Sequence, residues 1–358
     1  MDPFSPLTAG DLELPNRLVM APMTRLRADE RGVPGDLIAE YYAQRASTGL
    51  IISEGVFPSA ESKGYAGQPG IETDEQAAGW RAVADAVHAA GGRIVMQVMN
   101  AGRVSHTEVT GTERIVAPSA IAIQDEVRVP SGEKKPFPVP HALTTEELAT
   151  VRDEFVAASR RAIDAGFDGV DVHAANGYLL HEFLSPASNT RTDAYGGSPE
   201  ARAAFPLEVT RAIADEIGAG RVGIRISPSH NIQDVLETDA DDVRATYEAL
   251  VDGIAPLGLS YLSVLHAEPT GELVQDLRSR FGGVLVANSG FGAPTTRDEA
   301  SSLIAEGRAD AVAVGRPLIA NPDLVERWQG GHAENDVVQE TVYANGAEGY
   351  TDYERLSA

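Results

Sequence analysis

The feature that most constrains the fold of this 358-residue chain is a series of eight short apolar segments, each followed by a segment of helical character. The apolar segments are residues 17–24, 50–53, 93–99, 169–173, 222–226, 261–264, 284–287 and 311–314. The helical segments are residues 36–47, 74–90, 144–165, 200–216, 239–252, 272–280, 296–306 and 323–329. The last three apolar segments are nearly continuous, as expected of parallel strands buried on both faces. Eight such units predict an α/β fold, a (β/α)8 TIM barrel.

We expect residues 1–358 to form one barrel domain, because α/β barrels often reach this length undivided. Residues 1–15 are rich in proline and are expected to be a loop. Residues 100–142 contain several Pro, Gly and charged residues, and a loop this long in a compact domain is usually a lid or binding loop. The prediction is therefore a barrel with a long capping loop, residues 100–142, after strand 3. Thr144 and Glu147 then form a capping-box pattern at the start of a helix.

Composition narrows the classes of function. There is no run of about 18 apolar residues and no basic N-terminal region followed by an apolar core, so neither a transmembrane helix nor a signal peptide is expected. The absence of Cys excludes disulfides, thiolate catalysis and Cys-held zinc or iron–sulfur clusters. A net charge of −24 disfavours nucleic acid and anionic lipid as partners. We expect a cytoplasmic monomer or homodimer that binds neither nucleic acid nor membrane.

The fourth apolar segment ends in three polar side chains of different chemistry, His173, Asn176 and Tyr178. Barrel enzymes place their sites at the C-terminal ends of the strands. His173 and Asn176 could both donate to one substrate oxygen, and Tyr178 could supply a proton nearby. A purely structural alternative has His173 capping a buried strand and Tyr178 packing in the core. The residues at the ends of the other strands provide the evidence that distinguishes these two interpretations.

Polar residues and glycines also follow most of the other strands. They are Thr24, Gly55, Gln97, Arg225, Ser289, Gly290, Gly315 and Arg316. The loops after strands seven and eight have the form of a barrel phosphate site, in which Arg316 adds a bidentate charge. Arg225 lies inside an apolar strand and needs either a polar or anionic ligand or a salt bridge across the barrel. Gln97 can pair with an amide-like ring edge. A ring with such an edge and a phosphate tail is flavin mononucleotide (FMN).

The sequence resembles the old yellow enzymes, FMN-dependent ene-reductases, over nearly its whole length. The matching segments are residues 16–24 (Asn-Arg-Leu-Val-Met-Ala-Pro-Met-Thr), 171–178 (Asp-Val-His-Ala-Ala-Asn-Gly-Tyr), 189–198 (Asn-Thr-Arg-Thr-Asp-Ala-Tyr-Gly-Gly-Ser), 314–317 (Val-Gly-Arg-Pro), 321–324 (Asn-Pro-Asp-Leu) and 346–353 (Gly-Ala-Glu-Gly-Tyr-Thr-Asp-Tyr). The C-terminal segment, residues 346–353, resembles the corresponding segment of the bacterial members of the family. Together the motifs are highly specific for this family.

This resemblance implies non-covalent FMN that NADPH or NADH reduces, followed by reduction of the C=C bond of enones, enals, nitroalkenes or other nitro compounds. The implied flavin-binding residues are Pro22, Met23, Thr24, Gly55, Gln97, Arg225, Ser289, Gly290, Gly315 and Arg316. His173 and Asn176 would bind the carbonyl or nitro oxygen, and Tyr178 would protonate the α-carbon after hydride arrives from flavin N5. Met99 and Tyr343 are further expected substrate contacts. No metal is implied.

One departure from the family pattern follows Gln97. The family usually has an apolar residue, then Trp and often His, whereas residues 98–100 here are Val-Met-Asn. Strand alternation puts Met99 on the same side as Gln97, facing the same cavity. Because Met is smaller than Trp and flexible, we expect a wider cavity at this point.

Other functions fit parts of the sequence. A Schiff-base aldolase needs a lysine at a strand end, but Lys63, Lys134 and Lys135 lie in expected loops. A Rossmann dehydrogenase is disfavoured because the late Gly-Phe-Gly at 290–292 lacks a third glycine. Two alternatives stay open: an FMN-binding redox protein without ene-reductase turnover, and a metal-dependent barrel hydrolase. Ligands for the latter would come from His173, His181, Glu182, His230 and His266.

Overall fold

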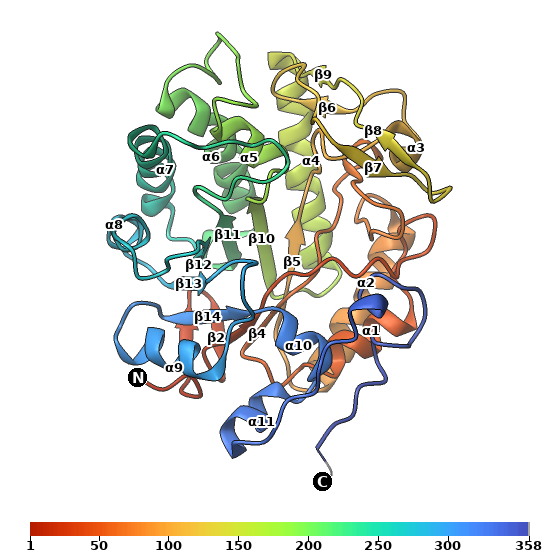
Figure 1. Ribbon diagram of the computed structural model, residues 1–358, viewed down its shortest axis with the longest axis vertical. Coiled ribbons are helices and arrows are strands. Elements are labelled where there is room, and N and C mark those ends of the chain that lie inside the picture. The colour runs from red at the N-terminus through yellow and green to blue at the C-terminus, as the bar shows by residue number, and fades with distance from the viewer. Residues whose placement is uncertain (357–358) are drawn as a thin grey trace.

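The computed structural model describes residues 1–356, in which eight parallel strands form a closed barrel (Figure 1). In chain order the barrel strands are β3 (Leu18–Met20), β4 (Leu50–Ile52), β5 (Ile94–Val98), β10 (Gly169–Ala174), β11 (Val222–Ile226), β12 (Tyr261–Leu265), β13 (Leu285–Asn288) and β14 (Ala311–Val314). Pairing of β14 with β3, with Val314 opposite Met20, closes the ring. The predicted (β/α)8 barrel is confirmed.

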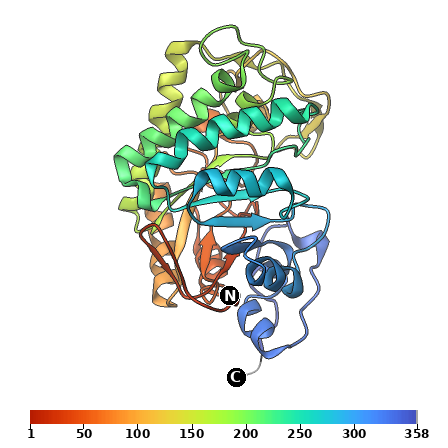
Figure 2. The ribbon, with the colours of Figure 1, turned by 90° about the vertical axis from the view of Figure 1, so that its left-hand side faces the viewer.

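Helices follow the strands and cover the outside of the barrel. They are α1 (Asp36–Ala43), α2 (Asp74–Ala89), α4 (Thr145–Asp164), α6 (Pro199–Ile217), α7 (Ala240–Ile254), α8 (Glu272–Phe281), α9 (Arg297–Ala305) and α11 (Leu324–Gly330). Figure 2 shows α6, α7 and α8, in green to cyan, side by side on the outer surface. The predicted capping box starts α4: Glu147 N–H donates to Thr144 Oγ1 at 3.2 Å, and Thr144 N–H donates to Glu147 Oε2 at 2.8 Å.

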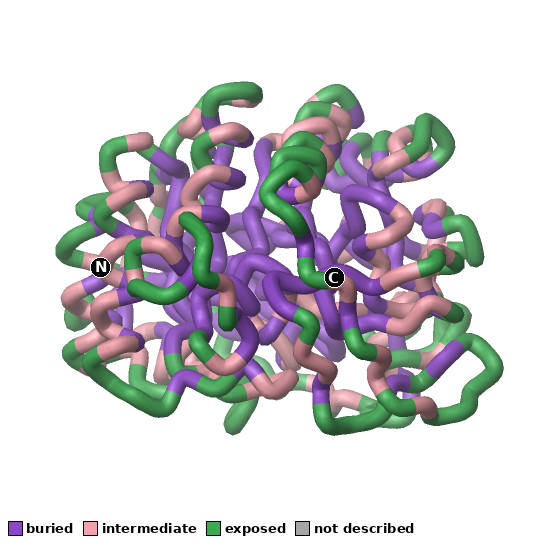
Figure 3. The backbone as a smooth tube through the Cα atoms, turned by 90° about the horizontal axis from the view of Figure 1, so that it is seen from above, coloured by how far each residue is buried: buried purple, intermediate pink, exposed green. Residues whose placement is uncertain are grey.

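The core has two layers, and the alternation of side chains along each strand divides residues between them. On β5, Ile94 and Met96 face the helices, where Trp80 of α2 is fully buried. Val95 faces the barrel interior instead. Figure 3 shows the molecule from above, with buried residues gathered at the centre and exposed residues toward the rim. Gln97 is on the same side of β5 as Val95, so its amide lies inside the barrel.

The N-terminal residues form a hairpin, so the loop expected for residues 1–15 was wrong. Strands β1 (Leu7–Ala9) and β2 (Leu12–Leu14) pair antiparallel, and their buried side chains pack with the barrel interior. The turn needs Gly10, at φ +58°, because an added Cβ would lie 2.4 Å from the carbonyl oxygen of Gly220. Each strand has only three residues, so the alternation of apolar and polar residues is too short to indicate a strand in a proline-rich segment. The hairpin closes the N-terminal end of the barrel.

Residues 100–142 contain short elements within the long connection that was expected. They are α3 (Thr107–Thr110), β6 (Val116–Ala117), β7 (Glu126–Arg128), β8 (Lys134–Pro136) and β9 (His141–Ala142). β7 and β8 form an antiparallel hairpin, at the upper right of Figure 1. Within residues 1–356, no helix has both the length and the apolar character that crossing a membrane requires.

Candidate active site

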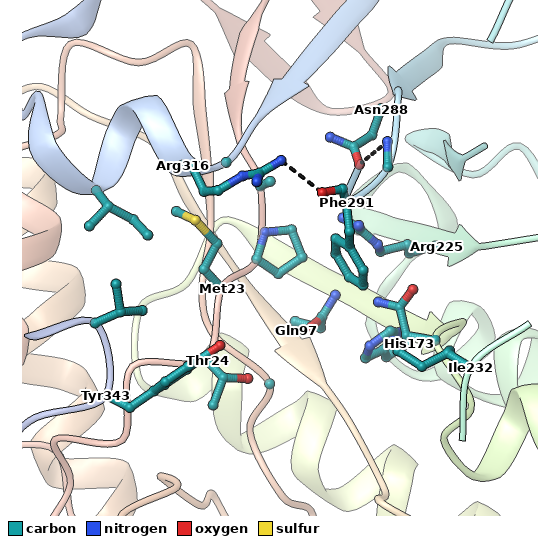
Figure 4. Close-up of a pocket in the computed structure, with 18 of the residues that line it drawn as sticks. Met23, Thr24, Gln97, His173, Arg225, Ile232, Asn288, Phe291, Arg316 and Tyr343 are labelled. Carbon is teal, nitrogen blue, oxygen red and sulfur yellow. Dashed lines mark hydrogen bonds between the residues drawn. The ribbon is translucent and has the colours of Figure 1, made fainter. Parts of the chain in front are cut away.

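A cavity of about 680 Å³ opens at the C-terminal ends of the barrel strands, a size usual for small-molecule sites. Every predicted site residue except Ser289 contributes to its wall. These residues are Pro22, Met23, Thr24, Gly55, Gln97, Met99, His173, Asn176, Tyr178, Arg225, Gly290, Gly315, Arg316 and Tyr343. Figure 4 shows how Gln97, His173 and Arg225 approach the cavity from the side opposite Met23 and Thr24. The barrel thus gathers residues that are up to 321 positions apart, from Pro22 to Tyr343.

The end of β10 and the sharp turn after it direct three side chains into the cavity. Asn176 has φ +57°, in the left-handed region that few residues other than Gly, Asn and Asp adopt, and Gly177 follows at φ +82°. The Asn176 N–H donates to Ser227 Oγ at 2.8 Å, and the Gly177 N–H donates to His181 Nδ1 at 2.9 Å. Helix α5 (Leu179–Leu184) begins immediately afterwards. His173 at the end of β10 and Asn176 and Tyr178 of the following turn therefore reach the cavity side by side.

Burial keeps His173 and Tyr178 uncharged. It lowers the pKa of the His173 imidazole well below its usual range, and the nearby Arg225 charge acts in the same direction. Burial also raises the pKa of the Tyr178 phenol well above its usual range, with Tyr65 contributing. The rings of His173 and Tyr178 meet edge to face with centroids 5.2 Å apart. A neutral imidazole offers one N–H donor and a protonated phenol retains a transferable proton.

Tyr65 is a site residue that no local sequence pattern indicates. Its hydroxyl lies 2.8 Å from the hydroxyl of Tyr178, although the two residues are 113 positions apart. It lies in the connection after β4, just beyond the short 3-10 helix η1 (Ala60–Ser62). The hydrogen bond holds the Tyr178 phenol in place at the cavity wall.

A buried carboxylate, Asp171, lies beneath the cavity floor, two residues before His173 on β10. Its Oδ2 accepts from Gln97 Nε2 at 2.8 Å, and its Oδ1 accepts from the Tyr261 hydroxyl at 3.0 Å. Burial raises the pKa of Asp171 to about 6, although the Gln97 hydrogen bond and the Arg225 charge oppose the rise. Arg225, opposite His173 on β11, has two buried nitrogens, Nε and Nη1, with no hydrogen-bond partner in residues 1–356.

The loops after β13 and β14 form the opposite end of the cavity. Asn288 Oδ1 accepts from the Gly290 N–H at 3.3 Å, and Arg316 Nη2 donates to the Phe291 carbonyl oxygen at 2.9 Å (dashed lines in Figure 4). Gly315 is not crowded, since the nearest atom to an added Cβ, the sulfur of Met23, would be at a van der Waals distance of 3.6 Å. Helix α10 (Arg316–Ala320) follows at once. This is a polar, open pair of loops suited to a phosphate.

The cavity fits FMN. Four buried atoms at its wall lack hydrogen-bond partners among the described residues: Arg225 Nε and Nη1, His173 Nδ1 and Asn176 Oδ1. A buried polar group left unpaired costs about 1–3 kcal/mol, so this concentration indicates a polar ligand. Gln97 and Arg225 suit the amide and carbonyl edge of a flavin ring, and the glycine loops with Arg316 suit its phosphate.

Several wall residues were missing from the sequence-based prediction. They are Leu26, Tyr65, Arg128, Ile232, Gln233, Asn288, Phe291, Thr295, Ile319, Val337, Gln339 and Val342. Phe291 lies between Gly290 and Gly292 in the predicted phosphate loop, and this position could have indicated that it lines the cavity. Arg128 belongs to β7 and the last three precede Tyr343 in the C-terminal segment, where no local pattern marks them. Their place in the wall depends on how distant segments pack.

The residues considered as metal ligands do not converge. Within the described part of the chain, no group of three or more His, Asp or Glu side chains is arranged to hold a metal ion. His181 is buried on α5 and its Nε2 lies 3.3 Å from Glu237 Oε1. The same imidazole accepts from the Gly177 N–H, so it supports the turn that carries Asn176.

Comparisons with known proteins agree with this site. Residues 2–335 match the NADH:flavin oxidoreductase / NADH oxidase family. A Leishmania infantum protein named "Probable flavin mononucleotide-dependent alkene reductase" is 41% identical, over 98% of this chain and 96% of its own length. 12-oxophytodienoate reductase 7 of Oryza sativa subsp. japonica is 37% identical, over 98% and 93%. A solved structure of morphinone reductase in complex with tetrahydroNAD is 43% identical with a TM-score of 0.92, covering 100% of this chain and 98% of that chain.

The fold, the cavity and these relatives define an FMN-dependent oxidoreductase that uses a nicotinamide reductant. The chain belongs to the NADH:flavin oxidoreductase / NADH oxidase family, the family of the old yellow enzymes. It is an enzyme of the NAD(P)H-dependent flavin ene-reductase type.

Proposed function

We propose that this enzyme reduces the C=C bond of α,β-unsaturated carbonyl or nitro compounds, with His173 and Asn176 binding the activating oxygen and Tyr178 donating the proton. One observation carries the proposal. Two unpartnered polar side chains and a protonated phenol reach the cavity from the end of β10 and the turn after it, beside the residues suited to the flavin ring. An enzyme that only stored electrons in a flavin would not need this combination.

FMN bound in this cavity would supply the hydride chemistry, with NAD(P)H as the source of the hydride and the β-carbon of the substrate as its acceptor. As the β-carbon gains hydride, negative charge develops on the carbonyl or nitro oxygen of the substrate. The neutral His173 imidazole and the Asn176 amide each provide an N–H donor for that oxygen. Donors already in place stabilise the developing charge more than the ground state, as in an oxyanion hole.

Tyr178 then supplies the proton that completes the reduction at the α-carbon. Its pKa, raised by burial, keeps the phenol protonated at neutral and mildly alkaline pH. The hydrogen bond to Tyr65 at 2.8 Å fixes the direction of the hydroxyl. General acid catalysis by a positioned group contributes about 10²–10⁴-fold in rate.

The remaining wall selects the shape of the substrate. Met99, Ile232, Phe291 and Tyr343 present apolar or aromatic surface around the proposed reacting region. Such a wall favours cyclic or aryl enones, enals and nitroalkenes over charged molecules. We also infer that residues 100–142 cap the cavity within a single domain, because Arg128 of β7 reaches its wall.

The test is to follow the two half-reactions separately in purified protein. Anaerobic NADPH or NADH should bleach the flavin absorbance, and a cyclic enone added afterwards should restore it with one saturated product per flavin. Flavin that is reduced by NAD(P)H but never reoxidised by enones, enals or nitroalkenes would contradict the proposed function. That result would favour a redox protein without ene-reductase turnover.

A further inference from the structure

The strongest unexplained feature of the cavity is Asp171, a fully buried carboxylate that the proposed chemistry does not use. Strand register pairs Asp171 with Gln97 on β5 and with Gly223 on β11. Gly223 in turn pairs with Tyr261 on β12. Paired residues on neighbouring strands point to the same face of a sheet, so all four positions face the barrel interior.

Gly223 makes room for a contact across the barrel. A Cβ added at this glycine would lie 2.1 Å from the ring of Tyr261, so any larger residue would displace the phenol. With glycine there, the Tyr261 hydroxyl reaches Asp171 Oδ1 at 3.0 Å. The other carboxylate oxygen accepts from Gln97 at 2.8 Å, so neither oxygen of Asp171 is left without a donor.

The charged group facing Asp171 is Arg225, whose positive charge favours the ionised carboxylate. Arg225 Nε and Nη1 have no hydrogen-bond partner among residues 1–356, so neither nitrogen bonds to Asp171 and both remain free at the cavity wall. The other titratable groups around Asp171 are the phenol of Tyr261 and, two positions along β10, the neutral imidazole of His173. Asp171 therefore places a negative charge beneath the cavity floor, close to the positive charge of Arg225.

We propose that Asp171 is a positioning residue that orients the Gln97 amide toward the flavin and offsets the charge of Arg225, and thereby weakens binding of reduced FMN relative to oxidised FMN. The inference rests on the proposed flavin site. Hydride transfer adds two electrons and one proton to the ring, which gains one negative charge. A fixed carboxylate beneath the floor opposes that charge, while Arg225 favours it, so their balance sets the flavin potential.

The central variant is Asp171→Asn, which keeps the size of the side chain and can still bond both Gln97 and Tyr261. At pH 7 the wild-type carboxyl is mostly ionised, so this substitution removes a charge. The ratio of affinities for reduced and oxidised FMN should rise by about tenfold, equivalent to a midpoint potential about 30 mV higher for a two-electron couple. A reductive titration against a reference dye measures the potential, and quenching of flavin fluorescence measures the affinity of oxidised FMN.

Three further variants separate charge from packing. Asp171→Glu keeps the negative charge, so its flavin midpoint potential should stay near that of the wild type. Ser263→Ala removes a buried neutral hydroxyl opposite Arg225 and should leave the affinity ratio within about twofold, since no charge changes. Tyr261→Phe removes a bond that lowers the pKa of Asp171, so it should raise the potential in the same direction as Asp171→Asn but by less.

An Asp171→Asn enzyme that binds FMN at an unchanged potential would overturn the inference and leave the proposed function intact. If Asp171→Asn does not fold, an unchanged or lowered potential in Tyr261→Phe would overturn it instead. A wild-type protein that binds no FMN would overturn both the inference and the proposed flavin site.

Discussion

Two buried arginines at opposite ends of the barrel differ in whether their side-chain nitrogens have hydrogen-bond partners within the protein. Arg17 lies at the N-terminal end and is 8% exposed, and all three of its side-chain nitrogens have partners. Nε donates to Ser5 Oγ at 2.9 Å, Nη1 to the Asp310 carbonyl at 2.8 Å and Nη2 to the Pro6 carbonyl at 3.1 Å. Arg225 at the C-terminal end is 2% exposed and leaves Nε and Nη1 without partners in residues 1–356.

This difference extends to the surroundings of each arginine. The N-terminal end is closed by the β1–β2 hairpin, whose apolar side chains fill the barrel interior, and Ser260 Oγ donates to the Ala9 carbonyl at 2.8 Å. The C-terminal end holds the cavity and its unpartnered buried atoms. Buried donors and acceptors that are paired within the protein stabilise the fold. Buried donors and acceptors that remain unpaired at a cavity wall mark the ligand site. Substitutions at the two ends should therefore fail in different ways.

The largest expected effect is on chemistry at the open end. Tyr178→Phe should slow reoxidation of the flavin by a cyclic enone by about 10²–10⁴-fold, because the general acid is lost. Reduction by NAD(P)H should be nearly unchanged. In the wild type, the raised pKa of Tyr178 should keep the phenol protonated, so the enone half-reaction should not slow between neutral pH and about pH 10, the ordinary pKa of tyrosine.

Stopped-flow absorbance separates these two half-reactions. Tyr195→Phe is a suitable control, because it removes a phenol hydroxyl that contacts Glu208 and is not part of the cavity wall. Equal slowing of both half-reactions in Tyr178→Phe, or no slowing with the enone, would refute the role of proton donor.

The next effect is on cofactor binding. Arg225→Met should weaken FMN binding by about 10–100-fold, since each hydrogen bond from a charged donor contributes about 1.5–3 kcal/mol. The apoprotein should not lose stability, because a buried and incompletely paired charge is replaced by an apolar side chain of similar length. Equilibrium binding of FMN and urea unfolding of the apoprotein measure the two quantities. Unchanged FMN affinity would show that Arg225 is structural after all.

Arg17→Met should give the opposite result. The free energy of unfolding should fall by about 1–3 kcal/mol, because hydrogen-bond acceptors at the closed end lose their donor. FMN affinity and the rates of both half-reactions should stay as in the wild type. Urea unfolding of this variant beside Arg225→Met provides the direct comparison. A loss of FMN affinity equal to that of Arg225→Met would remove the distinction between the two ends.

The smallest effect concerns substrate shape. Met99 lines the cavity and packs on Gly55, where an added Cβ would lie 2.6 Å from its sulfur. Met99→Trp should reduce kcat/KM for enones with bulky β-substituents about 10-fold more than for a small cyclic enone. Met96→Leu, on the opposite face of β5, should leave this ratio unchanged. A shift well under that range, below about threefold, would mean that Met99 does not set the cavity width.

Much of the fold and site could be predicted from local sequence. The apolar segments, the Thr144 capping box and the Asn176-Gly177 turn each depend on neighbouring residues, because strand alternation, cap hydrogen bonds and left-handed backbone are local properties. The position of a polar residue at a strand end then places it at one face of a barrel. That rule alone predicts that His173, Arg225 and Arg316 meet at one cavity, as they do.

The sequence by itself determined the barrel, the face that carries the site and the chemistry of the residues there. Only the tertiary structure decided which distant side chains meet: Tyr65 with Tyr178, Tyr261 with Asp171 through the space left by Gly223, and the N-terminal hairpin with the barrel interior. In the sequence, Asp171 is one residue within a predicted buried strand, and no local pattern indicates its contacts. Its role emerges only when closure of the barrel fixes the register of four strands, because contacts across the interior depend on that register and not on neighbours in the chain.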